Sequence, residues 1–382
     1  MRLWSHIRHI RWISQPGALM PTTVRFGIIG AGAIAPSLCH SLANHKQVEI
    51  AAVYDQHAGR QTAMCDEFKI PKRPRTLEAL LSDPDIDAIY VAVPNKFHVP
   101  YTLKALAAGK HVVAEKPFAM DIDEARLVAA AVKKSKKLWM LGMNRRFPAM
   151  MQKARDLVAR GVIGEVYHAK ARWQRRWGCP KLQTWFGHKQ LSGGGCLLDI
   201  GVHMLDQTMY IAGNFKPLTC SGSVYGKFGH RGLGEGGWGK SDRDPKMTFN
   251  VEDFANAHIR LAGGLSIDLD VSWAAHMVKG NVMESIIYGT EGSLWVGQDE
   301  GVAGGKESVV LSTRKGSEFI NNEDPKAKVL YPHCDRFNNF VNAILGKEKP
   351  CVTIDQALAV QTVLTGIYRS SAKGAEVDLR KI

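Results

Sequence analysis

The chain has 382 residues, more than one ordinary domain, because single hydrophobic cores stop growing at about 250 to 300 residues. Its 45% apolar content is that of a globular protein, and no apolar run reaches the roughly 20 residues that a membrane span needs. The net charge of +14 comes from basic residues that are dispersed along the chain, which argues against a nucleic-acid-binding protein.

The seven cysteines are scattered and form no Cys-x-x-Cys pair and no Cys/His cluster with metal-ligand spacing. We therefore expect a cytoplasmic protein without a metal site. Residues 1–21 carry arginines but no acid and no continuous apolar segment. This composition predicts a disordered extension, with Met20 as a possible initiator methionine. An amphipathic targeting peptide is the alternative.

The folded part is expected to begin with a strand, a glycine turn and a helix. Residues 24–29 form an apolar run that breaks into Gly30-Ala31-Gly32-Ala33-Ile34-Ala35, followed by apolar residues at helical spacing. Gly30 permits the tight turn, and Gly32 lets a pyrophosphate approach the backbone. We expect a dinucleotide to lie against Gly30, Gly32, Ala33 and Ile34.

The second expected strand, residues 48–54, ends at Asp55. This is about 20 residues beyond the glycines, where a carboxylate that binds the ribose hydroxyls belongs. Such a carboxylate repels a 2′-phosphate, which favours NAD as the cofactor. Nearby Arg60 keeps NADP as an alternative cofactor. The alternative for Asp55 is a solvated carboxylate at a strand end, without a ribose contact.

Strand and helix patterns continue to alternate up to residue 146, which predicts a parallel doubly wound sheet for residues 22–146. Ligands of such a sheet bind beyond the carboxyl ends of its strands. The residues expected to line this edge are Gly30, Asp55, Pro94, Asn95, Glu115 and Lys116. Lys116 is thereby placed beside the cofactor, although most lysines at strand ends are solvated.

From Pro148 the pattern changes to one helix and then long alternating strands with glycine-rich loops. Residues 147–382 are therefore expected to form an α+β domain with an open, mostly antiparallel sheet, which could serve as a substrate wall and as the face of a dimer or tetramer. The expected strands are residues 165–174, 217–225, 254–261, 265–273, 282–288 and 293–296. Helical patterns over 336–345 and 354–371 close the chain, and we expect the C-terminal helix to pack back on the first domain.

The glycine-rich stretch 192–206 carries Asp199 and His203 four residues apart. On a helix these side chains project from one face and can interact. A carboxylate beside an imidazole orients it and raises its basicity, as a general base requires. A simple surface pair is the alternative.

Several motifs, in order, resemble the Gfo/Idh/MocA oxidoreductases over residues 22–375. They are Gly30-x-Gly32-x-x-Ala35, Pro94-Asn95-x-x-His98, Gly109-Lys110-His111-Val112-x-x-Glu115-Lys116-Pro117 and Gly194-Gly195-x-x-x-Asp199-x-Gly201-x-His203-x-x-Asp206. The resemblance implies a nicotinamide cofactor between a Rossmann domain and an open sheet. It also implies that Lys116, Asp199 and His203 are the catalytic set, with Asn95 and His98 near the nicotinamide end.

A second resemblance concerns residues 172–180 together with Trp185-Phe186, which are similar to family members that oxidise a ring hydroxyl of glycosides or anhydrosugars. Indole faces stack on sugar C–H surfaces, and arginines donate to hydroxyls. Arg176, Trp177 and Trp185 are therefore candidate substrate residues beside Asp199 and His203. The alternative is that Trp173 and Trp185 are core aromatics.

These observations predict hydride transfer from a secondary alcohol of a sugar or cyclitol to NAD. We expect His203 to take the hydroxyl proton, Asp199 to hold the imidazole and Lys116 to steady the alkoxide, although lysine and histidine can exchange roles in the family. The alternatives are a glycosidase that uses transient oxidation by bound NAD, a non-catalytic cofactor-sensing regulator, and a reductase of an imine or enone.

Overall fold

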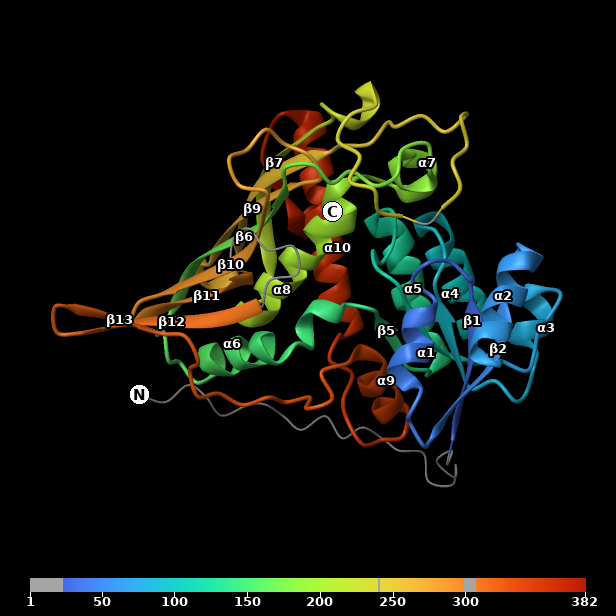
Figure 1. Ribbon diagram of the computed structural model, residues 1–382. Helices are drawn as coiled ribbons and strands as arrows, with labels where there is room; N and C mark the ends of the chain where they lie inside the picture. The colour runs from blue at the N-terminus through green and yellow to red at the C-terminus, as the bar shows by residue number, and fades with distance from the viewer. Residues whose placement is uncertain (1–22, 240, 299–306) are drawn as a thin grey trace.

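The computed structural model describes residues 23–239, 241–298 and 307–382. The extension predicted for residues 1–21 and the possible start at Met20 lie outside these ranges. None of the described helices is both long and apolar enough to cross a membrane. Figure 1 shows the first part of the chain on one side and a large sheet on the other.

The first part is a five-stranded parallel sheet with the order β2-β1-β3-β4-β5, which confirms the predicted doubly wound fold. Its strands are β1 (Val24–Ile29), β2 (Val48–Tyr54), β3 (Ala88–Val91), β4 (His111–Ala114) and β5 (Trp139–Leu141). Its helices are α1 (Pro36–Leu42), α2 (Ala58–Phe68), α3 (Leu77–Leu81), α4 (His98–Ala107) and α5 (Ile122–Ser135). Every residue of β3 and β5 is buried, as expected where helices cover both faces of a parallel sheet.

The second part is a nine-stranded sheet with the order β13-β12-β11-β10-β6-β9-β8-β7-β14. Strands β6 and β9 run parallel, and the other neighbours pair antiparallel. The strands are β6 (Val166–Arg175), β7 (Pro217–Tyr225), β8 (Phe254–Leu261), β9 (Ser266–Ser272), β10 (Asn281–Gly289), β11 (Gly292–Gln298), β12 (Glu307–Lys315), β13 (Glu318–Asn322) and β14 (Val377–Asp378). The mostly antiparallel sheet is thus confirmed, and β12, β13 and β14 are additions to the expected strands.

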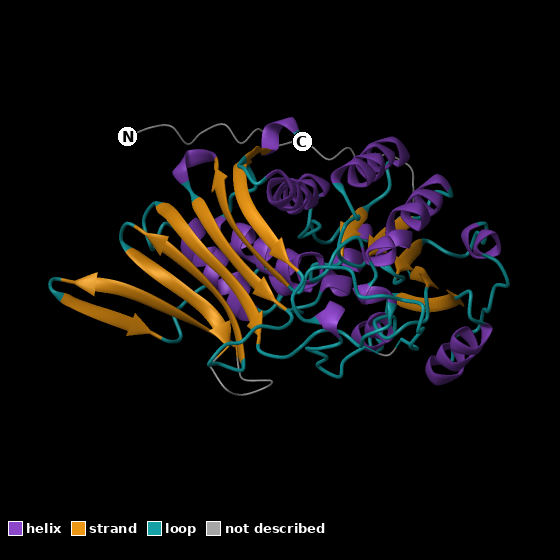
Figure 2. Cartoon of the chain, turned by 90° about the horizontal axis from the view of Figure 1, so that it is seen from above, coloured by secondary structure: helices purple, strands orange, loops and turns teal. Residues whose placement is uncertain are grey.

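Helices pack against one face of this sheet (Figure 2). Helices α6 (Ala149–Ala159), α8 (Val202–Ala212) and α10 (Ile354–Lys373) all contact its strands. Along β8 the side chains of Ala257 and Ile259 are buried, whereas Asn256 and Arg260 are exposed on the opposite face. The sheet is therefore apolar on its helix-covered face and polar on the other.

The last two helices return to the first sheet. Helix α10 contacts α5 and β5, and α9 (Arg336–Ile344) contacts α1 and β4. At the second junction Arg336 lies 2.5 Å from the buried carboxylate of Glu115, which also accepts a 2.6 Å hydrogen bond from the Tyr90 hydroxyl. A buried charge pair therefore ties the end of the chain to the residue that precedes Lys116.

A second buried ion pair lies where the two parts of the chain meet. Arg146 donates to both carboxylate oxygens of Asp206 at 2.8 and 2.5 Å, and neither side chain is more than 1% exposed. The same guanidinium donates to Gln356 at 2.6 Å, near the start of α10. One arginine thus joins the segment after β5 to both α8 and α10.

We expect Arg336→Met to lower the free energy of unfolding by about 3–5 kcal/mol, because Glu115 would stay buried without its cation. Urea unfolding checks this. The control is Lys104→Met, which breaks an exposed pair with Glu78 and should cost less than about 1 kcal/mol. Equal losses in the two variants would contradict the assigned role of the buried pair.

Candidate active site

The glycine turn after β1 has the backbone shape that a dinucleotide needs. Gly30 has a φ of +98°, and a Cβ added there would lie 2.3 Å from the carbonyl oxygen of Ala92, so only glycine fits. A Cβ added at Gly32 would meet no atom within 4 Å, so this part of the backbone is open to a ligand. These residues fit a bound pyrophosphate.

Asp55 lies beside this turn at the end of β2. Its carboxylate accepts hydrogen bonds from the backbone N–H groups of Ala31 and His57, each at 2.7 Å. Arg60 forms a 2.8 Å ion pair with Asp242, which comes from a loop of the second sheet. The Asp55 carboxylate disfavours a 2′-phosphate and so favours NAD, whereas Arg60, 44% exposed in its pair, remains accessible to such a phosphate.

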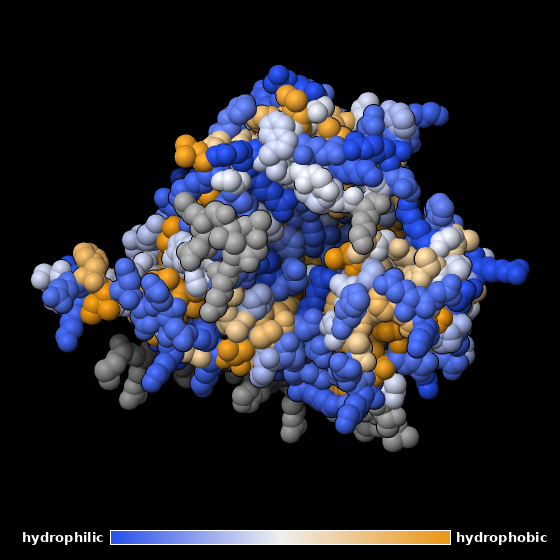
Figure 3. Space-filling view, in the orientation of Figure 1, coloured by the Kyte–Doolittle hydropathy of each residue, from blue (hydrophilic) through white to orange (hydrophobic). Residues whose placement is uncertain are grey.

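A cavity of about 570 Å³ runs along the turn. Its lining includes, from the first part of the chain, Gly30, Gly32, Ala33, Ile34, Asp55, Arg60 and Pro94 and, from the second, Trp185, Phe186, Trp238, Asp242 and Met247. The surface is hollowed between the two parts of the chain (Figure 3). The residues predicted for the cofactor edge therefore face a second wall that is largely aromatic.

Lys116 follows β4, and its peptide bond to Pro117 is cis. The Lys116 ammonium donates to the Asp199 carboxylate at 2.6 Å and to the Asp199 backbone carbonyl at 3.0 Å. The other oxygen of that carboxylate accepts a 2.9 Å hydrogen bond from the Trp273 indole. Two of the three predicted catalytic residues thus form an ion pair between the two parts of the chain.

The environment keeps Asp199 ionised. Burial acts to raise the pKa of Asp199, but the Lys116 charge and the hydrogen bonds from Lys116 and Trp273 bring it below its ordinary value, with help from Arg175. The carboxylate and the ammonium are 12% and 19% exposed, so solvent reaches both only in part. The pair is accessible from the site and is held in a fixed geometry.

The expected contact between Asp199 and His203 does not form. Asp199 lies in the π-helical turn η4 (Leu197–Gly201), whose wider hydrogen-bond spacing breaks the four-residue register assumed from the sequence. Within the described part of the chain no hydrogen bond joins the two side chains, and the Nδ1 atom of His203 is buried without a partner. The Asp199 carboxylate instead accepts hydrogen bonds from Lys116 and Trp273.

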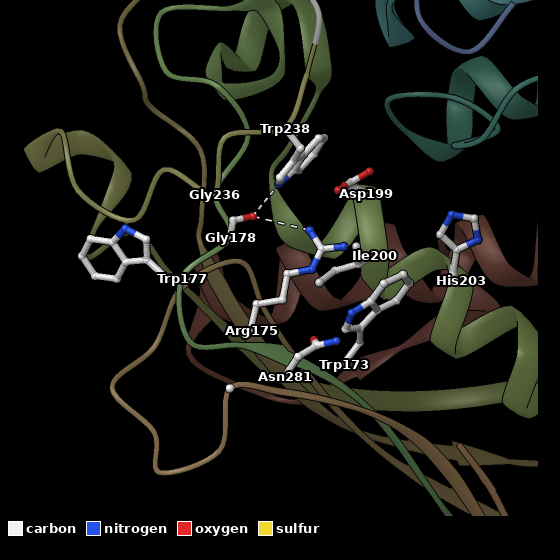
Figure 4. Close-up of a pocket in the computed structure, with 11 residues that line it drawn as sticks. Trp173, Arg175, Trp177, Gly178, Asp199, Ile200, His203, Gly236, Trp238 and Asn281 are labelled. Carbon is white, nitrogen blue, oxygen red and sulfur yellow. Dashed lines mark hydrogen bonds between the residues drawn. The ribbon is translucent and has the colours of Figure 1, made fainter. Parts of the chain in front are cut away.

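His203 is an uncharged base. Burial, followed by the nearby Lys116 charge, holds the pKa of His203 well below its usual range, and the opposing effect of Asp199 is smaller. The ring is therefore neutral at pH 7 and can accept a proton. It lines a cavity of about 500 Å³ together with Asp199, Trp173, Arg175 and Trp177 (Figure 4).

A smaller cavity of about 220 Å³ connects these two spaces. It shares Ile34 and Trp185 with the cavity along the glycine turn, and it shares Asp199 with the cavity of His203. Trp238 lines all three. A continuous trough therefore leads from Gly30, past Lys116 and Asp199, to the aromatic cavity.

Comparison with known families agrees with this arrangement. Residues 24–143 match the model described as "Oxidoreductase family, NAD-binding Rossmann fold", and residues 151–295 match the GFO/IDH/MocA C-terminal domain. The chain belongs to the Gfo/Idh/MocA oxidoreductase family. It is an NAD(P)-dependent oxidoreductase with an NAD-binding Rossmann domain.

Two curated relatives span nearly the whole chain. D-glucoside 3-dehydrogenase of Escherichia coli (strain K12) is 29% identical over 365 residues, which cover 95% of this chain and 99% of that protein. 1,5-anhydro-D-fructose reductase of Ensifer adhaerens is 32% identical over 359 residues, 93% of this chain and 98% of that protein. A solved levoglucosan dehydrogenase complex with NADH and levoglucosan has the same fold, with a TM-score of 0.77 at 20% identity over 94% of this chain and 99% of that one.

Three residues predicted to lie at the cofactor of this Gfo/Idh/MocA enzyme use their polar atoms elsewhere. The two ring nitrogens of His98 each lie 2.8 Å from a backbone carbonyl, that of Val93 or that of Pro117, and a neutral ring donates to one of the two. The Asn95 amide donates to the Ser192 carbonyl at 2.8 Å. The Glu115 carboxylate accepts a hydrogen bond from Tyr90 and forms an ion pair with Arg336. All three line the connecting cavity, but their side chains hold the loops around Lys116 in place.

The substrate residues need one correction. Arg176 donates to the backbone carbonyls of Met277 at 2.9 Å and of Val278, whereas Arg175 lines the aromatic cavity. The Arg175 guanidinium lies 5.0 Å from the Trp173 ring and 5.6 Å from the Trp238 ring. The period-two alternation of β6 could have shown this, because residues 169, 171, 173 and 175 share the helix-covered face.

Of the predicted tryptophans, Trp177 lines the aromatic cavity and is 50% exposed. Trp185 stacks on Phe186 at 3.9 Å and lines the cofactor side of the trough. Trp238, which the sequence analysis did not single out, lies in a glycine-rich loop without periodicity, so no sequence signal marked it.

We expect the His203 ring in this enzyme to titrate well below the ordinary imidazole pKa of about 6.5. Lys116→Met should raise that pKa, because it removes a positive charge that disfavours the imidazolium. Alcohol oxidation would then lose its base at a higher pH than in the wild type. NMR titration of the ring, assigned with His203→Gln, measures the shift, and an unchanged or lowered pKa in Lys116→Met would contradict this electrostatic account.

Proposed function

We propose that the enzyme transfers a hydride between a secondary hydroxyl carbon of a sugar, glycoside or cyclitol and the nicotinamide of NAD. One observation supports this proposal: Lys116 and Asp199 line the connecting cavity between the glycine turn and the aromatic cavity, and His203 lines the aromatic cavity together with Asp199. The names of the curated relatives, a glucoside dehydrogenase and an anhydrofructose reductase, support the substrate class.

Bound NAD supplies the hydride acceptor, and the chain supplies the rest of the chemistry. Neutral His203 takes the proton of the substrate hydroxyl as general base. The Lys116 ammonium donates to the same oxygen and stabilises the negative charge that develops on it. Asp199 orients this ammonium by accepting its hydrogen bond. This role replaces the expected contact between Asp199 and the His203 imidazole.

The aromatic cavity recognises the sugar ring. Indole faces of Trp173 and Trp238 can stack on its C–H surfaces, because the faces of a pyranose ring are apolar while its hydroxyls lie at the edges. Arg175 lies beside both rings and has donors left for hydroxyl groups, since its hydrogen bond to the Gly178 carbonyl is a long one of 3.4 Å. The cavity thus combines stacking with donation.

We further propose a cytoplasmic homo-oligomer. The seven cysteines are free thiols, six of them buried, which suits a reducing compartment. The polar face of the nine-stranded sheet, opposite α6, α8 and α10, is a broad surface on which a second copy could pack.

A screen of NAD and NADP reduction across sugars, glycosides and cyclitols tests the proposed reaction. We expect NADH formation with at least one polyol and a preference for NAD over NADP. His203→Ala and Lys116→Ala should each lower kcat about 10²- to 10⁴-fold with that substrate. His40→Ala and Lys104→Ala are matched controls that should keep wild-type turnover, because both residues are exposed and neither lines any of the three cavities.

Wild-type turnover in both active-site variants would contradict the proposed roles. Release of an aglycone without net NADH would identify a glycosidase that uses transient oxidation instead. Tight NAD binding with no turnover of any polyol would favour a cofactor-sensing regulator.

A further inference from the structure

An aromatic cluster lies at the open end of the aromatic cavity. Trp177 lines the cavity with half of its surface exposed, and its ring contacts Phe228 edge-on at 6.1 Å. Phe228 in turn contacts His276 edge-on at 5.2 Å. We call Trp177, Phe228 and His276 the rim cluster. The proton-transfer scheme above leaves it without a role.

The rim cluster is at the far end of the cavity from the base. Figure 4 shows Trp177 and His203 on opposite sides of the labelled residues, with Arg175 and Trp173 between them. A sugar ring with one hydroxyl at His203 therefore fills the part of the cavity near Arg175. A substituent on the opposite side of the ring would extend toward Trp177.

Glycines keep the passage to the rim open. Gly178, Gly236 and Gly280 line the cavity. A Cβ at Gly236 would lie 2.6 Å from the Gly178 Cα, so these two backbones touch and admit no side chain. A Cβ at Gly280 would meet no atom within 4 Å, so the space beside it is free.

The exposed indole of the rim favours a flat apolar group. Arg176, the residue before Trp177, donates to the carbonyls of Met277 and Val278, and the exposed Lys227 and Lys279 flank Phe228 and Val278 in the chain. Val278 itself is 94% exposed and adds apolar surface at the same loop. A flat hydrophobic group gains most from an exposed indole, because stacking removes apolar area of both partners from water.

We infer that the rim cluster is a second subsite, which binds the flat, apolar aglycone of a glycoside whose sugar ring lies at His203. This inference rests on the proposed function. It specifies the substrates as glycosides with an aromatic aglycone, in preference to free sugars or small alkyl glycosides.

The test compares kcat/KM for a phenyl glycoside with kcat/KM for the methyl glycoside of the same sugar. We expect the wild type to prefer the phenyl compound by about tenfold, the size of one good aromatic contact. Trp177→Ala should bring the ratio close to one, and Trp177→Phe should keep part of it. Gly280→Leu, which fills the free space beside the passage, should also lower the ratio. Phe319→Ala, an aromatic residue 79% exposed on β13, is the control and should keep the wild-type ratio.

The outcomes separate this inference from the proposed function. Equal efficiency with both glycosides in the wild type, or an unchanged ratio in Trp177→Ala and Gly280→Leu, overturns the aglycone subsite and leaves sugar oxidation standing. Absence of oxidation with every sugar overturns both. If Trp177→Ala does not fold, Trp177→Phe and Gly280→Leu decide the question.

Discussion

The ion pair between Lys116 and Asp199 is the contact on which the site depends. A charged group removed from water is tolerated only when a partner compensates it, so neither side chain can be where it is without the other. Lys116 comes from the end of β4 and Asp199 from the turn before α8, 83 residues later. Their 2.6 Å contact therefore joins the two parts of the chain at the site proposed for cofactor and substrate.

Two further buried pairs strengthen the same boundary. Glu115 and Arg336 anchor α9 next to Lys116, and Arg146 and Asp206 join the end of the first domain to α8. Hydride transfer requires the reacting carbons to be held in a narrow range of distance and direction, and small displacements are costly. A boundary held by paired charges on rigid elements supplies that precision. His203, the proposed base, adds no charge of its own, and its pKa is lowered by burial and then by this same Lys116.

Much of this site could be predicted from local sequence patterns. Gly30 and Asp55 were predicted because a tight turn and a ribose contact demand particular residue types at a particular spacing. Lys116 was predicted at the same edge because parallel topology puts strand ends on one edge, and it lies after β4, in contact with Asp199. The partner of Asp199 could not be predicted, because Asp199 lies in a π-helical turn and not in a regular α-helix. The start of this turn is held by a contact distant in sequence: the Glu252 carboxylate accepts hydrogen bonds from the backbone N–H groups of Gly195 and Leu197.

Other misses have a similar origin. Arg175 was passed over for Arg176, although strand alternation distinguishes the two once the boundaries of β6 are known. Trp238 reaches the trough from a loop whose course is set by contacts distant in sequence, such as its 2.8 Å bond to the Gly178 carbonyl. Every residue of strand β13 is exposed, so its sequence lacks the alternation of apolar and polar residues that predicts a half-buried strand.

A double-substitution cycle on Lys116 and Asp199 tests the central claim most directly. The kcat/KM for a turned-over polyol would be measured in Lys116→Met, Asp199→Asn and the double variant. If the two residues act as one unit, the second substitution should cost less than about threefold after the first, far below its cost in the wild type. Losses that multiply independently would show that the ion pair is not what holds this site together.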